Sequence, residues 1–218
     1  VTIAVQGQDG FNDYISSMLV WGDKLLLSSY NSLYAWNSET RKLVQVQGYD
    51  QLQYTLTDTE NGGIELGDDD YCYFDTDLYV IGGKLYRMAQ ISDADNNTTS
   101  MLVEIVIADD GTMSLGETID LGDALSITDE AEGQTYSYTR SLQNPCSFGR
   151  TLYALSYGDS LELLSLDLDS ETVDTVTLDT DYDINSISPY TEGKLLMIGS
   201  NYNVDPIETA LLVYDTQT

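Results

Sequence analysis

The chain has 218 residues, and 8 Lys and Arg stand against 37 Asp and Glu, for a formal net charge of −29. Such a chain repels phosphate backbones and anionic membrane surfaces, so we expect no nucleic-acid partner. No membrane insertion is expected either, because no apolar run approaches the roughly 18 residues that cross a bilayer. Histidine is absent, which excludes Ser-His-Asp and Cys-His catalysis and histidine-ligated metals.

A short turn followed by an apolar strand recurs four times along the chain. The four copies span Trp21–Leu26, Gly82–Tyr86, Phe148–Tyr153 and Glu192–Leu196. A second turn rich in Asp, Asn, Ser and Thr follows each copy, at Trp36–Thr40, Ala108–Thr112, Leu168–Thr172 and Tyr214–Thr218. Their spacing is consistent with a repeat of roughly 40 to 50 residues that carries insertions, which is typical of propeller blades.

The first repeat has room for four strands, at residues 15–21, 24–30, 32–37 and 41–47. The turns between them are too short for parallel crossovers, so each repeat is predicted to be an antiparallel meander. We therefore predict an all-β fold, a β-propeller of four-stranded antiparallel blades, as a single domain over residues 1–218. The predicted blades cover 8–47, 71–121, 138–179 and 187–218, no helix is expected, and all three prolines are assigned to connections.

The two ends of the chain suggest how the sheet edges could be protected. Residues 3–9 repeat the pattern of residues 44–50, which include the fourth strand of the first repeat, and the last repeat stops after its third strand. Residues 1–7 could therefore supply an outer strand of the last blade and close a ring. A segment of a larger propeller is an equally open alternative.

This layout resembles the bacterial quinoprotein-like and YVTN-type β-propellers, whose blades start on a Gly-Lys-Leu-Tyr-like strand and carry an Asp-x-x-Thr turn. It is also similar to propeller modules of extracellular solute-binding lipoproteins, through Phe11–Ile15 ahead of Leu19–Leu25. The resemblance implies an extracellular or surface-anchored bacterial protein with other domains in a longer chain. The resemblance does not imply that this chain binds a quinone, because no set of its residues matches a quinone site and because fold does not imply function.

Strand parity predicts that the long connections share one face. These are residues 48–77, 91–100, 122–147 and 200–208, whereas the opposite face holds only tight turns. Long loops on a rigid scaffold often carry function, and mixed aromatic and polar side chains suit sugars or peptides. The predicted ligand-binding residues are Tyr71, Tyr73, Phe74, Tyr136, Tyr138, Arg140 and Tyr202. Alternatively, these side chains merely pack and solvate the loops.

One segment partly matches a Ca²⁺-binding loop. Asp93, Asp95 and Asn97 supply oxygen ligands at alternate positions, and the Thr99 carbonyl could add another. Thr98 occupies the place where the sharp turn wants Gly, and Glu104 lies in a predicted strand rather than a helix. Alternatively, this segment is only a polar loop tip that binds no metal. Ca²⁺ is the one cofactor that the sequence suggests.

Cys72 and Cys146 permit one disulfide, but isolated thiols without C-x-x-C spacing are more often unpaired. The function predicted from these observations is a non-catalytic extracellular binding module that recognises a carbohydrate or a protein. Two alternatives stay open: a structural or docking domain of a transport-associated lipoprotein, and a carboxylate-dependent glycoside hydrolase. The last needs only two suitably spaced carboxylates, and no pair is singled out by spacing.

Overall fold

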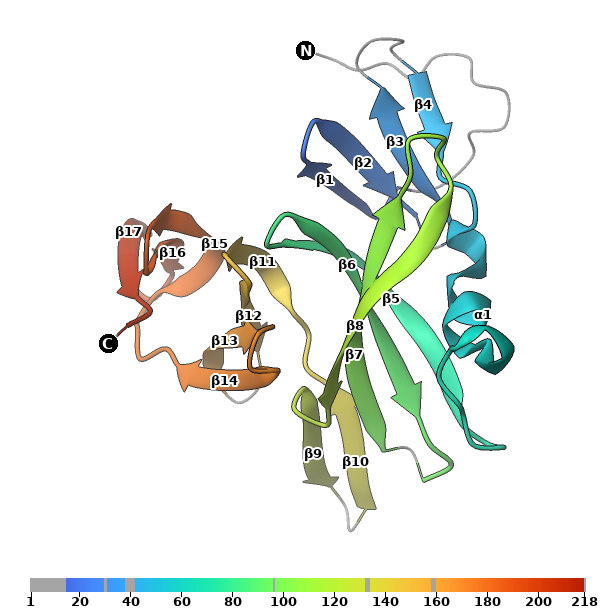
Figure 1. Cartoon of the computed structure of the whole chain (residues 1–218). Helices are drawn as coiled ribbons and strands as arrows, with labels where there is room; N and C mark the ends of the chain where they lie inside the picture. The colour runs from blue at the N-terminus through green and yellow to red at the C-terminus, as the bar shows by residue number, and fades with distance from the viewer. Residues whose placement is uncertain are drawn as a thin grey trace. The chain divides into compact units, whose positions relative to one another are not determined.

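The computed structural model describes residues 15–29, 31–37, 42–95, 97–131, 134–157 and 160–217. The fold class is as predicted: the described part of the chain is all-β, with four antiparallel sheets of three or four strands that form blades of the β-propeller type and a separate two-stranded hairpin (Figure 1). The chain divides into two compact units. The first comprises Val1–Leu78, Gly83–Asn97 and Met101–Thr118, and the second comprises Tyr79–Gly82, Thr98–Ser100 and Ile119–Thr218.

The first sheet is the meander expected from the first repeat. Its strands pair in the order β1-β2-β3-β4, and their bounds are Ser17–Trp21, Lys24–Ser28, Leu33–Asn37 and Lys42–Gln45. Leu26 and Ser28 are fully buried on β2, and the fully buried Leu33 pairs with Ser28 from β3, because alternate residues of a strand, and residues paired across two strands, lie on the same face of the sheet. The predicted strand positions are confirmed to within a few residues.

The second sheet is also four-stranded, with longer strands. Its order is β5-β6-β7-β8, with bounds Tyr71–Ile81, Lys84–Ser92, Thr98–Ile107 and Met113–Gly122. Cys72, Ala89 and Val103 pack into a buried cluster on this sheet together with Leu56. The sheet therefore has its own small core.

The expectation that the chain contains no helix is wrong. Between the first two sheets lie a 3-10 turn η1 (Tyr49–Gln51), the helix α1 (Leu52–Thr57) and a second 3-10 turn η2 (Thr59–Asn61). Leu52 and Leu56 are buried one helical turn apart. A helix of six residues with two apolar positions leaves too little periodicity to be recognised in a sequence.

The predicted long connection at 122–147 is mostly regular structure, which corrects that assignment. It contains the hairpin of β9 (Ser126–Ala131) and β10 (Gln134–Thr139) and the start of β11 (Gln143–Phe148). The third sheet then runs in the order β11-β12-β13-β14 with β12 at Thr151–Tyr157, β13 at Leu161–Asp167 and β14 at Thr172–Thr177. The connection at 91–100 is also shorter than expected, since β6 and β7 leave only residues 93–97 between them.

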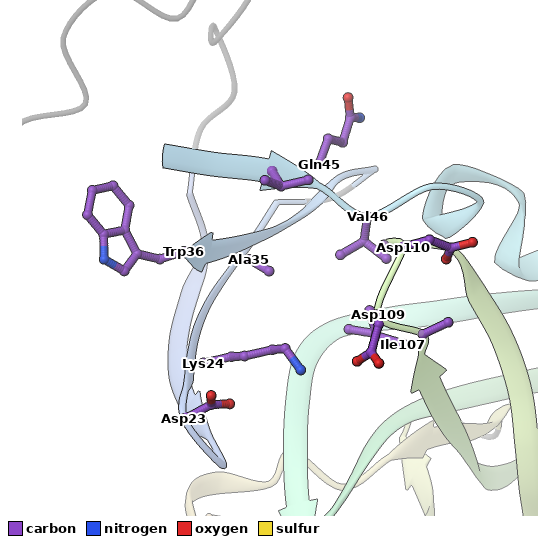
Figure 2. A pocket seen from close by; sticks show the side chains of 12 residues that line it. Asp23, Lys24, Ala35, Trp36, Gln45, Val46, Ile107, Asp109 and Asp110 are labelled. Carbon is purple, nitrogen blue, oxygen red and sulfur yellow. The ribbon is translucent and has the colours of Figure 1, made fainter. Parts of the chain in front are cut away.

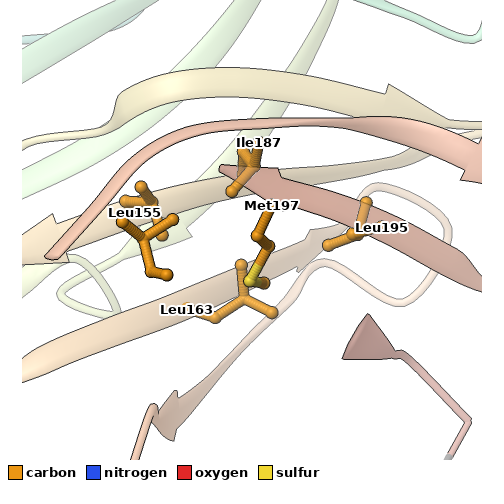
Figure 3. Close-up of a cluster of buried hydrophobic side chains, with 6 residues drawn as sticks. Leu155, Leu163, Ile187, Leu195 and Met197 are labelled. Atoms are coloured by element: carbon orange, nitrogen blue, oxygen red, sulfur yellow. The ribbon is translucent and has the colours of Figure 1, made fainter. Parts of the chain in front are cut away.

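The last sheet has three strands among the described residues, in the order β15-β16-β17. Their bounds are Asp183–Thr191, Lys194–Asn201 and Glu208–Asp215. Figure 3 shows the core that this sheet shares with the third: Leu155 and Leu163 face Ile187, Leu195 and Met197. Residues 1–7, the predicted closing strand, lie outside the described residues.

Glycine backbone geometry explains the repeated turn. The β1-β2, β5-β6, β11-β12 and β15-β16 connections each contain two residues, and each has a glycine at positive φ. Gly82 and Gly83 both take positive φ, at 59° and 80°. Two-residue hairpins need such backbone angles to match the twist of the strands, and glycine adopts them without steric cost.

Two of the three prolines lie in strands, which corrects their assignment to connections. Pro145 lies in β11 and Pro189 in β15, and only Pro206 lies in a connection, between β16 and β17. Both strands are at sheet edges, and the pairing register shifts at Gln143/Cys146 and at Pro189/Thr191. Edge positions and irregularities tolerate a residue that cannot donate a ladder hydrogen bond.

Candidate functional site

Two of the predicted ligand-binding residues form an exposed aromatic surface on β5. Tyr71 and Tyr73 are two positions apart and therefore share a face of the strand. They are 52% and 39% exposed, and their rings stack with centroids 5.9 Å apart and planes inclined by 20°. The Tyr73 hydroxyl donates a hydrogen bond to Gln90 Oε1 on the neighbouring strand β6. We call Tyr71 and Tyr73 the tyrosine platform.

A buried arginine lies beside the platform. Arg87 on β6 is 3% exposed, and its guanidinium carbon lies 4.8 Å from the ring centre of Tyr49 and 5.4 Å from that of Phe74. Its Nε donates a 2.6 Å hydrogen bond to the Asp75 carbonyl. Cation–π contacts and this hydrogen bond together offset the desolvation of the charge.

A small cavity of about 80 Å³ separates these groups, lined by Tyr49, Tyr73, Phe74 and Arg87 among others. The Tyr49 hydroxyl is buried and has no hydrogen-bond partner among the described residues. Burial raises the pKa of Tyr49 to about 12, a shift that Arg87 opposes and Asp75 reinforces. The phenol is therefore a neutral donor beside a cation, in a space that has room for one polar atom of a ligand or a water molecule.

The remaining predicted ligand-binding residues belong to the second unit. Tyr136 and Tyr138 belong to β10, in a stretch whose side chains lie outside the described residues. Arg140 forms an ion pair with Glu162, and its backbone N–H donates to the Leu125 carbonyl, so this residue holds the hairpin to β13. Tyr202 is exposed in the β16-β17 connection of the second unit.

The predicted Ca²⁺ loop is closed by its own hydrogen bonds. The Asp93 carboxylate accepts from the backbone N–H groups of Asp95 and Asn97 and from the Asn97 side-chain amide, at 2.8 to 2.9 Å. These bonds lower the pKa of Asp93. Thr99 lies in β7, and no cluster of three acidic or thiol ligands occurs in the part of the chain that is described.

Glu104, the last position of the Ca²⁺ pattern, is engaged elsewhere. Lys84 Nζ lies 2.9 Å from a Glu104 carboxylate oxygen and 3.0 Å from one of Glu117. Glu104 is therefore paired with a lysine in the described structure.

The two cysteines are free thiols, with Cys72 buried and Cys146 partly buried. Both are therefore reduced in the described structure.

A larger cleft lies within the first unit. It has a volume of about 400 Å³ and is bounded by β2, β3, β4 and the β7-β8 turn. Figure 2 shows Lys24 extending from β2 toward the turn that carries Asp109, and Ala35, Val46 and Ile107 also line the cleft. A volume of this size is within the roughly 300 to 1,000 Å³ that small-molecule sites occupy.

Backbone hydrogen bonds hold the wall of this cleft in place. Gln47 N–H donates to the Gly111 carbonyl at 2.9 Å, and Met113 N–H donates to the Gln47 carbonyl at 3.0 Å. Within the turn, the Asp110 carboxylate accepts from the backbone N–H and the hydroxyl of Thr112. The β7-β8 turn is therefore tied both to itself and to the segment that follows β4.

The cleft and Arg87 were both missed by reasoning from the sequence. Lys24 and Asp109 were noticed only as parts of the repeated turns, because a turn signature says nothing about which side chains face a cavity. Arg87 had a usable signal: it is one of 8 Lys and Arg in the chain, and it interrupts the apolar run Leu85–Ala89. A charge inside a buried strand is rarely found without partners.

No known protein family and no curated protein matches the chain. Among solved structures, it is similar to the extracellular domain of a protein described as a one component system from B. thetaiotaomicron, with 14% identity and a TM-score of 0.37. The match covers 94% of this chain and 23% of that chain, so this chain spans about a quarter of that structure. No helix in the described part of the chain is long and apolar enough to span a membrane.

Proposed function

We propose that this protein is a non-catalytic extracellular binding module that recognises a neutral carbohydrate through the tyrosine platform. The observation that carries this proposal is the pair of exposed, stacked rings of Tyr71 and Tyr73. Exposed aromatic rings give the apolar C–H face of a sugar a flat surface to contact, and adjacent polar groups accept or donate to its hydroxyls. The bacterial origin and surface anchoring implied by the family resemblance belong to the same proposal.

The platform is preorganised for such a ligand. The hydrogen bond from Tyr73 to Gln90 restrains the ring before any ligand arrives, and restrained side chains lose less entropy on binding. The net charge of −29 repels acidic polysaccharides and leaves neutral glycans unaffected. These features favour neutral oligosaccharides over uronic or sulfated ones.

Isothermal titration with soluble neutral oligosaccharides, including gluco-, xylo- and manno-oligosaccharides, tests this proposal. We expect Tyr71→Ala to weaken binding about tenfold, because loss of one stacked ring costs roughly 1 to 1.5 kcal/mol. Tyr190→Ala is the matched control, since Tyr190 is also exposed but lies at the end of β15. Equal binding by Tyr71→Ala and the unaltered protein, or no binding by any glycan, would reject the proposal.

The non-catalytic part of the proposal has its own test. Asp75 and Asp77 follow the platform along β5, and burial raises the pKa of Asp77, a shift that Arg87 opposes. A carboxyl with a raised pKa is a feature of glycosidase acids. We expect no release of nitrophenol from aryl glycosides; release that Asp77→Asn abolishes would establish the hydrolase alternative instead.

A docking role is favoured by a different observation, on the last sheet. Among the described residues, β17 is the edge strand of its sheet, and its Leu211 and Val213 are 69% and 55% exposed. A groove of about 310 Å³, lined by Leu178, Met197 and Leu212 among others, lies beside it. Edge strands accept an added strand. Replacing Leu211 and Val213 by Lys should abolish capture of a neighbouring domain if docking is the function, and should leave glycan binding unchanged.

For the cofactor, we propose Ca²⁺ at the loop of Asp93, Asp95, Asn97 and Thr99. A bound ion would raise the melting temperature by mass action. The test compares melting in EDTA and in millimolar Ca²⁺ for the unaltered protein and for Asp95→Asn. A Ca²⁺-dependent rise that the variant loses supports the site, and identical melting in both buffers rejects it.

A further inference from the structure

We propose that the cleft between Lys24 and Asp109 binds an apolar zwitterion of the α-amino-acid class. This site is separate from the tyrosine platform, and the proposal does not depend on carbohydrate binding. Three properties of the cleft carry it: a lysine without a carboxylate partner among the described residues, a carboxylate on the facing turn that no described residue engages, and apolar side chains that line the cleft beside them (Figure 2).

Lys24 differs from other cations of this acidic chain. Lys84, Arg140, Arg150 and Lys194 each lie within ion-pair distance of a carboxylate. Lys24 has no such partner among the described residues, and its Nζ instead lies 5.4 Å from the centre of the Trp21 ring. An ammonium at the mouth of a cleft, without a carboxylate of its own, is positioned to receive the carboxylate of a ligand.

The facing wall supplies the opposite charge. Asp109 and Asp110 lie side by side on the β7-β8 turn, but their roles differ. The Asp110 carboxylate accepts hydrogen bonds from Thr112. Asp109, in contrast, is exposed and makes no hydrogen bond or ion pair to another described residue. Asp109 is therefore the carboxylate available to a ligand ammonium group, whereas Asp23 lies beside Lys24 on the other side of the cleft.

The apolar part of the cleft determines which side chain the ligand carries. Ala35, Val46 and Ile107 line it, and Val46 and Ile107 are largely buried. An apolar side chain placed on these residues would remove hydrocarbon from water, which is favourable by about 25 cal/mol for each Å² buried. The volume of about 400 Å³ exceeds that of a single branched or aromatic amino acid and leaves room for bound water.

The charge of the whole molecule selects among ligand classes. An anion would be repelled by a protein of net charge −29, and a simple cation would leave Lys24 unpaired in the cleft. A zwitterion carries no net charge, so long-range repulsion does not oppose its approach, and it satisfies both walls. This argument favours free amino acids such as leucine, methionine or phenylalanine.

Isothermal titration with L-leucine, L-methionine and L-phenylalanine tests the site, and analogues identify each contact. Leucinamide lacks the carboxylate, and N-acetyl-leucine lacks the ammonium group. Lys24→Met should weaken binding of the best amino acid about tenfold or more, the loss expected for one charge-assisted hydrogen bond. Leucinamide should bind weakly and equally to the unaltered protein and to Lys24→Met, because its missing group is the partner of Lys24.

Asp109→Asn should give the mirror result: weaker binding of the amino acid, and equal binding of N-acetyl-leucine to variant and unaltered protein. Lys194→Met is the matched control and should bind normally, since Lys194 pairs with Asp215 in the second unit. Methionine is unbranched and close to lysine in length, so Lys24→Met should fold, which circular dichroism checks. No binding of any of the three amino acids, or binding unaffected by Lys24→Met, overturns the proposal. We expect Lys24→Met to leave glycan binding unchanged. This result distinguishes the cleft from the tyrosine platform.

Discussion

The guanidinium carbon of Arg87 lies 4.8 Å from the centre of the Tyr49 ring, and both residues are buried. This contact joins the strand β6 to the irregular segment that follows the first sheet. A second ring, that of Phe74, lies 5.4 Å from the same guanidinium. The arginine therefore holds the segment carrying Tyr49 against the sheet that carries the tyrosine platform.

Arg87→Ala should lower the free energy of unfolding by about 2 to 4 kcal/mol, because a buried charge with two ring contacts and one hydrogen bond is removed. Urea unfolding followed by fluorescence measures the loss. Arg87→Lys retains the charge but not the planar group, so its loss should be intermediate. A change below about 0.5 kcal/mol, the range of ordinary surface substitutions, would contradict the structural role assigned to this residue.

The contribution of Lys84 to stability should depend on pH in the alkaline range. Hydrogen bonds to Glu104 and then Glu117 raise the pKa of Lys84 above its ordinary value of 10.5. A pKa raised in the folded state gives a contribution that is fully present below the unfolded pKa and is lost as pH rises through the folded pKa. The stability difference between the unaltered protein and Lys84→Met should therefore be constant at neutral pH and shrink only in strongly alkaline solution. A difference that disappears between pH 7 and 9 would contradict this assignment.

Both cysteines should be slow to react with a thiol reagent in the folded protein. Burial raises the pKa of Cys72 and of Cys146 to about 11 in each case. Only the thiolate is nucleophilic, so about 0.1% of each thiol is reactive at pH 8. Labelling with a chromogenic disulfide should proceed rapidly in denaturant and slowly in buffer. Two labelled thiols per chain in denaturant would show that no disulfide forms; none would show that one does.

Gly63→Ala should be more destabilising than Gly122→Ala. A methyl group on Gly63 would lie 2.5 Å from the Leu56 carbonyl oxygen and 2.6 Å from the Asp58 nitrogen, both backbone atoms. Gly122 has positive φ but nothing within 4 Å, so its cost is limited to about 1 kcal/mol of backbone strain. We expect about 2 kcal/mol or more at Gly63. Thermal melts of the two variants compare them directly, and equal losses would contradict the close approach of the two backbones.

Much of the local structure was predictable from the chain itself. The glycine turns at Gly22, Gly82, Gly149 and Gly193 could be located because the required positive φ selects glycine. Strand alternation then placed the first four strands. Tyr71 and Tyr73 were selected from the sequence as ligand-binding residues of the connection 48–77, but the strand β5 begins at Tyr71, and only this strand places both rings on one face.

Helix α1, the β9-β10 hairpin and the strand positions of Pro145 and Pro189 could not be predicted. Six helical residues carry too little periodicity, and a polar hairpin rich in Thr, Ser and Tyr resembles a connection. A proline in a strand is acceptable only at an edge, and the edge is defined by which strands pair.

The sequence by itself determined the all-β class, the four glycine-turn repeats and the acidic, histidine-free chemistry. Periodicity and backbone geometry are local properties, and charge is additive along the chain. Only the tertiary structure decided that Arg87 lies between Tyr49 and Phe74, and that Lys24 faces a cleft bounded by Asp109. Tyr49 and Arg87 are 38 positions apart in the chain, and Lys24 and Asp109 are 85 positions apart. Their proximity depends on how the sheets pack, which no short stretch of sequence specifies.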